Sequence, residues 1–389
     1  MMKPTATVFA LAFCLTLAHC HVAIHAATED GVIVHRIPGG GVQPQAAVDP
    51  KGVVHLIYLK GDPAHCDVEY IRSTDGSDTW SAPMRVNSQP GSAIAIGTVR
   101  GAQLALGRNE RVHVAWMGSS IAEPKSPDRS APMLCARMAD DGTSFESQRN
   151  VIASHPGLDG GGSIAADDRG NVDVAWHAPS VPKAAEQDRR VWVARSTDDG
   201  RTFATEVDLS DPATGACGCC GMRLFTAGGK VWALYRGAAE QVNRGMYLVE
   251  ADADLSGSHG REISPMKIGV CVTSTAAFGR SGTSPLAAWE TNEQIFWSKL
   301  SPSGDCDPRA APGAAKGRKH PAITADSAGQ VLLAWTEGTG WNKGGSVAWQ
   351  RFDPSGQPVP GSVGRAEDLP VWDSPAVFSL PRRPFVLVY

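Results

Sequence analysis

A repeated phrase runs through the whole 389-residue sequence: a polar or glycine-containing turn is followed by alternating apolar residues that end in Trp or Tyr. Its seven copies end at Tyr58, Trp116, Trp176, Tyr235, Trp289, Trp335 and Tyr389, so the period is roughly 46 to 60 residues. Alternation of this kind is typical of strands. A repeat of this length with about four short strands per unit predicts an all-β fold, the β-propeller.

A second short apolar segment and a turn precede each copy, as in AAVDPKG at 46–52 and AITADSAG at 322–329. Turns rich in Asp, Gly and Pro join two-stranded hairpins. Seven such hairpins favour seven blades, and six is the alternative if the last hairpin packs outside the ring. The last hairpin has no outer strands after it, so we expect the segment GVIVHRI at 31–37 to pair with it and close the ring. The propeller is expected to span 31–389 without a second domain.

Residues 1–26 are predicted to be a signal peptide. Lys3 precedes an apolar run from Val8 to Ala18, and small residues follow near Ala26. This pattern is typical of a cleaved leader, and it predicts a periplasmic or secreted product. No later stretch is long enough to span a membrane. The net charge of -4 gives no basic field for nucleic acid, and we expect a monomer.

Three turns share a motif: STDGSDTW at 73–80, MADDGTSF at 138–145 and STDDGRTF at 196–203. They resemble the Asp-box of sialidases and related BNR-repeat propellers. In this motif the Asp accepts backbone N–H bonds across a hairpin turn and the aromatic residue packs between strands. Asp75, Asp140 and Asp198 are therefore expected to be structural. The resemblance covers nearly all of the chain after the leader and implies a sialidase-like fold.

The resemblance also implies an active site on the face of the ring where the inner hairpins begin, here called the mouth. It implies that Asp67 is the acid/base and that Arg236 belongs to a clamp for a carboxylate, because guanidinium groups pair bidentately with carboxylates. The family's catalytic Glu has no counterpart, since Cys217 stands about where it would be. Glu290 or Glu337 would then supply the carboxylate that glycoside hydrolysis requires.

Further polar and aromatic side chains are expected at the mouth: Arg223, Arg244, Arg318, His320 and Trp341. The basic groups suit an anionic ligand, and Trp341 could stack on a sugar ring. We therefore expect a protein that binds, or acts on, a glycan or another anionic small molecule. Exo-glycosidase activity is the enzymatic form of this hypothesis, and it needs no cofactor. A scaffold that binds another protein on the propeller face is an alternative.

The segment TGACGCCGMRLF at 214–225 places Cys217, Cys219 and Cys220 within four positions. Cys66 and Cys271 map to the same end of the ring, and disulfides among these thiols are the default in an oxidising compartment. A second interpretation is a copper or zinc site made by the three cysteines with Cys66, Cys271 and His65, because thiolates and imidazoles bind these ions. A reactive thiol is the third. The sequence leaves these alternatives open.

Overall fold

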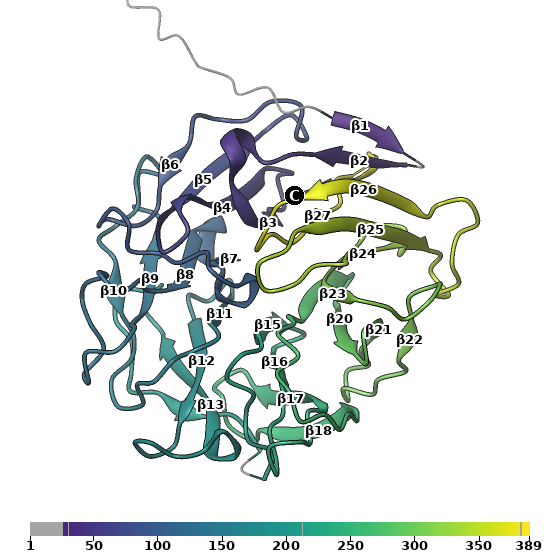
Figure 1. Ribbon diagram of the computed structural model, residues 1–389. Coiled ribbons are helices and arrows are strands. Elements are labelled where there is room, and N and C mark those ends of the chain that lie inside the picture. The colour runs from purple at the N-terminus through teal and green to yellow at the C-terminus, as the bar shows by residue number, and fades with distance from the viewer. Residues whose placement is uncertain (1–25, 30, 212, 382) are drawn as a thin grey trace, which may run out of the picture.

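The computed structural model describes residues 26–29, 31–211, 213–381 and 383–389. Seven four-stranded sheets radiate from a common centre, as Figure 1 shows. Each sheet is one blade of a β-propeller, and the described residues contain no α-helix, only short 3-10 turns. The predicted all-β fold with seven blades is confirmed, and the six-blade alternative is wrong because the last hairpin and the segment around 31–37 together form a seventh blade.

The first six blades follow the chain, each with its innermost strand first. Blade 1 contains β3 (Val42–Val48), β4 (Val54–Asp62), β5 (His65–Ser73) and β6 (Met84–Arg85); blade 2 contains β7 (Gln103–Leu106), β8 (Val112–Met117), β9 (Met133–Arg137) and β10 (Arg149–Asn150). Blade 3 contains β11 (Gly162–Ala166), β12 (Val172–Pro179), β13 (Arg189–Ser196) and β14 (Val207–Asp208). Blade 4 contains β15 (Arg223–Ala227), β16 (Lys230–Arg236), β17 (Met246–Asp252) and β18 (His259–Ser264). Blade 5 contains β19 (Ala277–Ser281), β20 (Ser284–Thr291), β21 (Gln294–Lys299) and β22 (Arg309–Ala310); blade 6 contains β23 (Arg318–Ala325), β24 (Val331–Glu337), β25 (Gly345–Phe352) and β26 (Gly364–Leu369).

The seventh blade joins the two ends of the described chain. It contains β27 (Ala376–Phe378), β28 (Phe385–Val388), β2 (Val32–His35) and β1 (Ala26–Glu29), in that order from the centre outward. The segment around 31–37 therefore closes the ring, as predicted. It pairs with β28 in the parallel direction, with Val32 opposite Phe385 and His35 opposite Val388. The predicted leader lies outside the described residues, apart from Ala26 at the start of β1.

The aromatic residue that ends each repeated phrase is buried. Relative exposure is 5% or less for all seven, from Tyr58 to Tyr389. Hydrophobic clusters combine side chains of neighbouring blades: Ile57 and Val68 of blade 1 pack with Trp116 and Leu134 of blade 2. Because alternate residues of a strand face opposite sides of its sheet, the period-two pattern supplies both layers between blades. The repeat thus fixes the packing that holds the ring together.

The Asp-box turns connect the third and fourth strands of their blades. In the first box, Asp75 Oδ1 accepts hydrogen bonds from Ser73 Oγ at 2.7 Å and from the Thr79 backbone N at 2.9 Å. Asp198 makes the same contacts in the third box, with Ser196 and Thr202. Both carboxylates therefore hold a turn together.

The second box has a different set of hydrogen bonds. Asp141, rather than Asp140, accepts from the Thr143 backbone N at 2.9 Å. Asp140 instead pairs with Arg111 at 2.6 Å and with Arg137 at 2.8 Å. Met138 stands where the other two boxes have the Ser that bonds the turn, which explains why this carboxylate is free to pair with arginines.

Candidate functional site

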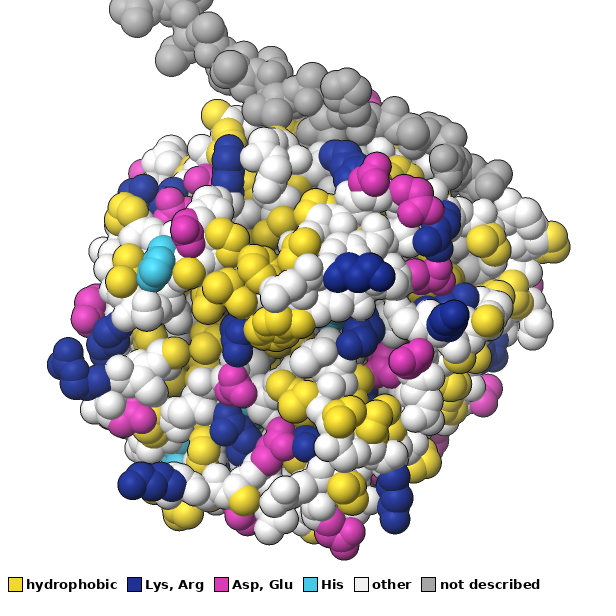
Figure 2. Space-filling model, in the orientation of Figure 1, with side chains coloured by type: hydrophobic (Ala, Val, Ile, Leu, Met, Phe, Trp, Pro, Cys, Tyr) yellow, Lys and Arg dark blue, Asp and Glu magenta, His cyan; other side chains and the backbone are white. Residues whose placement is uncertain are grey.

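The innermost strands begin at the mouth, the end of the ring where the second strands finish. They surround a cavity of about 640 Å³ that extends from Gln45, Gln103 and Arg223 near the mouth to the hairpin turns at the other face. A smaller hollow of about 20 Å³ lies at the mouth itself, lined by residues 97–99, Thr273, Lys319, His320, residues 339–341 and Trp372. On the face drawn in Figure 2, acidic and basic side chains are interspersed and apolar side chains gather near the upper centre.

Two tryptophans stand side by side at this hollow. The Trp341 side chain is about half exposed, at 49%, and the indole of Trp372 donates a hydrogen bond to the Trp341 carbonyl oxygen. The Arg100 guanidinium lies 5.7 Å from the centre of the Trp341 ring, within the range of a cation–π contact. The same guanidinium pairs with Asp159 Oδ1 at 3.1 Å and donates to the carbonyl oxygens of Asp159 and Ile96. The mouth therefore offers an aromatic surface beside an arginine that is already paired.

Lys319 and Arg223 add positive charge to the mouth. The Lys319 ammonium donates to the Val272 carbonyl oxygen at 2.6 Å and to Thr273 Oγ1 at 3.2 Å. Arg223 donates to the Met222 carbonyl oxygen at 2.8 Å, and no carboxylate pairs with it among the described residues. Burial lowers the pKa of His320 to about 3, helped by the charges of Lys319 and Arg223, so the imidazole is neutral at pH 7.

Glu290 and Arg236, both expected to be catalytic, are bonded to each other. Arg236 Nη2 lies 2.9 Å from Glu290 Oε2, and the side chains are 1% and 2% exposed. Arg236 also donates to the carbonyl oxygens of Glu290 and Arg244, at 2.6 and 2.8 Å. Burial raises the pKa of Glu290, although the charge of Arg236 works against this shift. The pair joins blade 4 to blade 5 and leaves neither group free for a ligand.

Glu337 is occupied in the same way. Its Oε1 accepts from Arg318 Nε at 3.1 Å and from Trp335 Nε1 at 2.8 Å, and its Oε2 pairs with Arg365. Burial opposes ionisation, but the Trp335 hydrogen bond and the charges of Arg318 and Arg365 outweigh it and lower the pKa of Glu337. Arg318 was expected to bind ligand, but its guanidinium donates to Glu337 in this network.

Asp67 lies in β5 and supports a loop. Its Oδ1 accepts from Asn87 Nδ2 and from the Gly91 backbone N, both at 2.7 Å. Because the hydrogen bonds go to one loop of the same blade, the carboxylate has a local structural task. The structure does not bring it together with Glu290 or Glu337 in one set of side chains.

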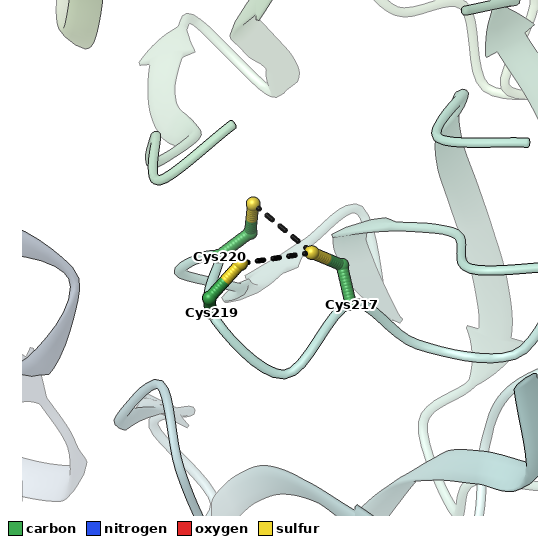
Figure 3. A group of neighbouring side chains, drawn as sticks. All are labelled: Cys217, Cys219 and Cys220. Atoms are coloured by element: carbon green, nitrogen blue, oxygen red, sulfur yellow. Dashed lines mark hydrogen bonds between the residues drawn. The ribbon is translucent and has the colours of Figure 1, made fainter. Parts of the chain in front are cut away.

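Cys217, Cys219 and Cys220 converge where the chain enters β15 (Figure 3). Cys217 Sγ lies 3.4 Å from Cys219 Sγ and 3.3 Å from Cys220 Sγ. The three sulfur atoms lie within 4.8 Å of one another, and all seven cysteines of the described residues are free thiols. Met266, Val272 and Ile268 pack around the cluster. The expected cluster thus exists, but without disulfide bonds.

The larger ligand set that we expected is divided by the fold. Cys66 is 1% exposed and belongs to the hydrophobic core between blades 1 and 2, where it pairs through its backbone with Ala93. His65 is exposed and contacts Ser120 Oγ at 3.0 Å. Both residues stand on another blade, so they do not join the three thiols. Cys271 is exposed and is a side-chain hydrogen-bond neighbour of Cys219.

The sequence did not indicate several polar groups that lie around the thiols. Glu186 accepts from the Gly218 backbone N at 2.7 Å and from Arg244 Nη2, also at 2.7 Å. Arg189 lies against the same loop, because a Cβ on Gly218 would be 3.3 Å from its Nε. Glu186 comes from the long connection between β12 and β13, and Arg189 is the first residue of β13. The repeated phrase does not extend into that connection, so only the folded structure brings it to the cluster.

Another carboxyl group at the mouth was also missed. Asp373 is 1% exposed, and its Oδ1 accepts from the backbone N atoms of Gln43 at 2.6 Å and Ser374 at 2.8 Å. Its Oδ2 has no hydrogen-bond partner among the described residues. Burial raises the pKa of Asp373 to about 7.

No protein-family model matches this sequence, and no curated protein sequence matches it either. Solved structures do match in fold. An α-L-arabinanase of Penicillium chrysogenum is 13% identical with a TM-score of 0.51, and the match covers 86% of this chain and 99% of that one. The NanB sialidase of Streptococcus pneumoniae is 8% identical with a TM-score of 0.51, over 83% and 68% of the two chains. An ulvan lyase of family PL25, bound to -[GlcA(1-4)Rha3S]-, is 11% identical with a TM-score of 0.52, over 89% and 90%.

These similarities and the seven radial sheets define the class: the chain is a β-propeller. More particularly, its fold is that of the sialidase-like propellers, as the Asp-box turns predicted. The low identities carry this conclusion for the fold alone. No helix among the described residues is long and apolar enough to cross a membrane.

Proposed function

We propose that this protein works outside the cytoplasm and binds an anionic carbohydrate at the mouth without hydrolysing it. The observation that carries the proposal is the exposed Trp341, with the Arg100 guanidinium over its ring. Sugar rings stack on aromatic side chains through their apolar faces, and nearby cations pair with acidic substituents. The N-terminal leader pattern supports export.

The chemical class of the ligand follows from the charges at the mouth. Lys319 is held at the hollow, and Arg223 has no carboxylate partner among the described residues. These cations favour a sugar that carries a carboxylate or a sulfate. The ulvan lyase of similar fold is bound to a saccharide that contains glucuronic acid, which supports this class of ligand for a propeller of the same shape.

We expect no turnover because the carboxylates of Glu290 and Glu337 are already bonded to other side chains. Glycoside hydrolysis needs two carboxyl groups that flank the scissile bond. Glu290 is buried against Arg236, and Glu337 accepts from three donors. Breaking either arrangement to release a carboxylate would leave a buried charge without its partner, which is strongly unfavourable.

Calorimetric titration with uronic-acid, sulfated and sialylated oligosaccharides tests the proposal. We expect saturable binding of at least one of them, weakened about tenfold by Trp341→Ala, because loss of about 1.4 kcal/mol of stacking corresponds to a factor of ten. Val363→Ala, at a position 61% exposed beside the outermost strand of blade 6, is the control and should bind as the unmodified protein does. No binding by the panel, or binding that Trp341→Ala leaves unchanged, would refute the proposal.

Reporter release from aryl glycosides of the same sugars tests the claim that the protein does not hydrolyse them. We expect no release above the uncatalysed rate. Release that is lost in a folded Glu290→Gln or Glu337→Gln variant would show that one of these carboxylates is catalytic and would overturn this part of the proposal.

A further inference from the structure

The three clustered thiols have a geometry that no disulfide explains. A disulfide joins two sulfur atoms at about 2.05 Å, which is well short of the separations in this cluster. Two thiolates on one metal ion at about 2.3 Å each lie about 3.8 to 4.0 Å apart in tetrahedral or trigonal geometry. The observed separations of 3.3 and 3.4 Å need to widen by only a few tenths of an ångström to hold such an ion.

The surroundings of the thiols suit a soft ion. Cys217 and Cys220 are 2% and 3% exposed, and their neighbours are the side chains of Met266, Val272 and Ile268. Hard ions such as Mg²⁺ and Ca²⁺ prefer oxygen ligands. Two carboxylates lie beside the thiol loop: Glu186 is already bonded to Arg244 and to the Gly218 backbone, and Asp159 pairs with Arg100. Thiolates select copper(I) or zinc.

Two arginines lie beside the cluster, and nearby positive charge stabilises thiolates. The guanidinium groups of Arg189 and Arg244 lie within electrostatic range of Cys217 and Cys219. Arg244 is 5% exposed, and its Nε and Nη1 have no hydrogen-bond partner among the described residues; the same holds for Arg189 Nε. Buried donors without partners are rare in folded proteins. Thiolates beside them would supply acceptors for these donors.

The backbone of the thiol loop is held in place before any ligand arrives. The Cys217 backbone N donates to the Arg236 carbonyl oxygen at 2.8 Å, and His177 Nε2 lies 3.2 Å from the Cys220 carbonyl oxygen. A Cβ on Gly160 would come within 2.4 Å of the Gly218 carbonyl oxygen, so the loop is wedged against blade 3. Ligands fixed in this way bind without a large loss of conformational entropy.

We propose that Cys217, Cys219 and Cys220 form a three-thiolate binding site for copper(I). Zinc sites usually have four nitrogen or sulfur ligands, whereas the described residues bring three ligand atoms together here. His177 does not add a fourth, since its Nε2 contacts the Cys220 carbonyl oxygen. Binding replaces the thiol protons, which pass to the solvent, and changes no oxidation state. Half-buried Cys219 gives the ion access from the mouth.

The site shares no ligand with the Trp341 surface, so each proposal can fail without the other. Full-length protein, reduced and kept free of oxygen, is titrated with copper(I) in competition with the chromogenic chelator bathocuproine disulfonate. We expect one tightly held copper(I) per chain, with the ultraviolet absorption of copper–thiolate bonds. Cys217→Ser and Cys220→Ser should each lose the tightly held ion. Cys306→Ser, a half-buried cysteine of blade 5 outside the cluster, should retain it.

A measurement on the unmodified protein tests the site even if the cysteine variants fail to fold. Alkylation followed by peptide mass spectrometry should show Cys217, Cys219 and Cys220 protected by copper(I), while Cys271 stays reactive. Equal labelling with and without copper, or binding that survives Cys220→Ser, would overturn the site. Loss of the ion in Cys271→Ser would overturn the three-ligand assignment, and tighter binding of zinc(II) would overturn the choice of ion.

Discussion

Arg236 of blade 4 and Glu290 of blade 5 form an ion pair of 2.9 Å in which both side chains are almost fully buried. The same guanidinium donates to the Glu290 carbonyl oxygen and to the Arg244 carbonyl oxygen. These groups therefore connect two neighbouring blades at the mouth. Removing one partner of a buried ion pair lowers the free energy of unfolding more than replacing both, because it leaves a buried charge uncompensated.

Arg236→Ala and Glu290→Ala are each expected to lower the free energy of unfolding by about 3 to 5 kcal/mol, because each leaves a buried charge uncompensated. The double variant Arg236→Met, Glu290→Leu should lose less than either. Urea unfolding followed by tryptophan fluorescence measures these differences. Lys51→Ala, in a surface ion pair with Glu110, is the control and should lose about 1 kcal/mol or less. Equal stability of Glu290→Ala and the unmodified protein would contradict the structural role of the pair.

Because the pKa of Asp199 is lowered in the folded protein, we expect the free energy of unfolding to fall in acid. Its carboxylate is 2% exposed and lies 2.6 Å from Arg111 Nε and 3.3 Å from His113 Nε2. Burial would raise its pKa, but these hydrogen bonds and charges hold the pKa of Asp199 at about 2, below the ordinary 3.8. The stabilisation is therefore complete above about pH 4 and is lost as the pH falls through 2.

Unfolding experiments across the pH range test this expectation. Asp199→Asn should be less stable than the unmodified protein by about 2 to 3 kcal/mol at pH 7, from about 1.4 kcal/mol per pKa unit. The difference should shrink between pH 4 and pH 2. Asp141→Asn, an exposed carboxylate of the neighbouring turn, serves for comparison. A difference between Asp199→Asn and the unmodified protein that does not change with pH would contradict the prediction.

Because the pKa of Asp373 is raised in the folded protein, we expect its contribution to the free energy of unfolding to change with pH in the opposite direction. Its folded pKa of about 7 lies above the ordinary 3.8, so the unfolded chain ionises first as the pH rises. The carboxyl group therefore destabilises the fold progressively from about pH 4 to pH 7. Asp373→Asn keeps an oxygen that can accept from Gln43 and Ser374 but cannot ionise. Its stability relative to the unmodified protein should rise over this interval, by at most about 4 kcal/mol; a flat difference would refute the assignment.

The closing strand gives a fourth prediction. Val34 of β2 is 9% exposed and packs in the hydrophobic cluster that contains Trp349, Phe385 and Leu387. Val34→Asp buries an unpaired carboxylate there and should cost about 3 kcal/mol or more of unfolding free energy. Val363→Asp, at a position 61% exposed, should change it by about 0.5 kcal/mol or less. Similar thermal unfolding of the two variants would show that β2 does not stabilise the ring.

Much of the fold could be predicted because its information is local. The aromatic residue of each repeated phrase packs between blades, and each turn follows from its Asp, Gly and Pro residues, so a count of phrases gives a count of blades. The direction of β2 could not be predicted. A strand that is not joined to its neighbour by a turn can pair either way, and nothing in the alternation of 31–37 distinguishes the two.

The site was harder to predict because it depends on contacts between blades. Cys217, Cys219 and Cys220 could be grouped since they are close in the sequence. The topology placed Cys66 at the correct end of its strands, but it could not show that this side chain turns into the core of blades 1 and 2. For the same reason the sequence did not show that Glu290 and Arg236 bond to each other, or that Glu186 supports the Gly218 backbone.

The seventh blade, with two strands from residues 26–35 and two from 376–388, also determines when the protein can fold. Domains tend to fold from the N-terminus as they are synthesised, yet here β1 and β2, which pair with each other, cannot join the ring until β28 exists. The six blades between them can form early, but an open ring would expose the apolar faces of blades 1 and 6 that blade 7 covers. Ring closure joins residues separated by nearly the whole chain, a slow kind of contact. Until residues 376–388 are made, one edge of β2 lacks its parallel partner and two apolar blade faces stay uncovered, and both features favour aggregation.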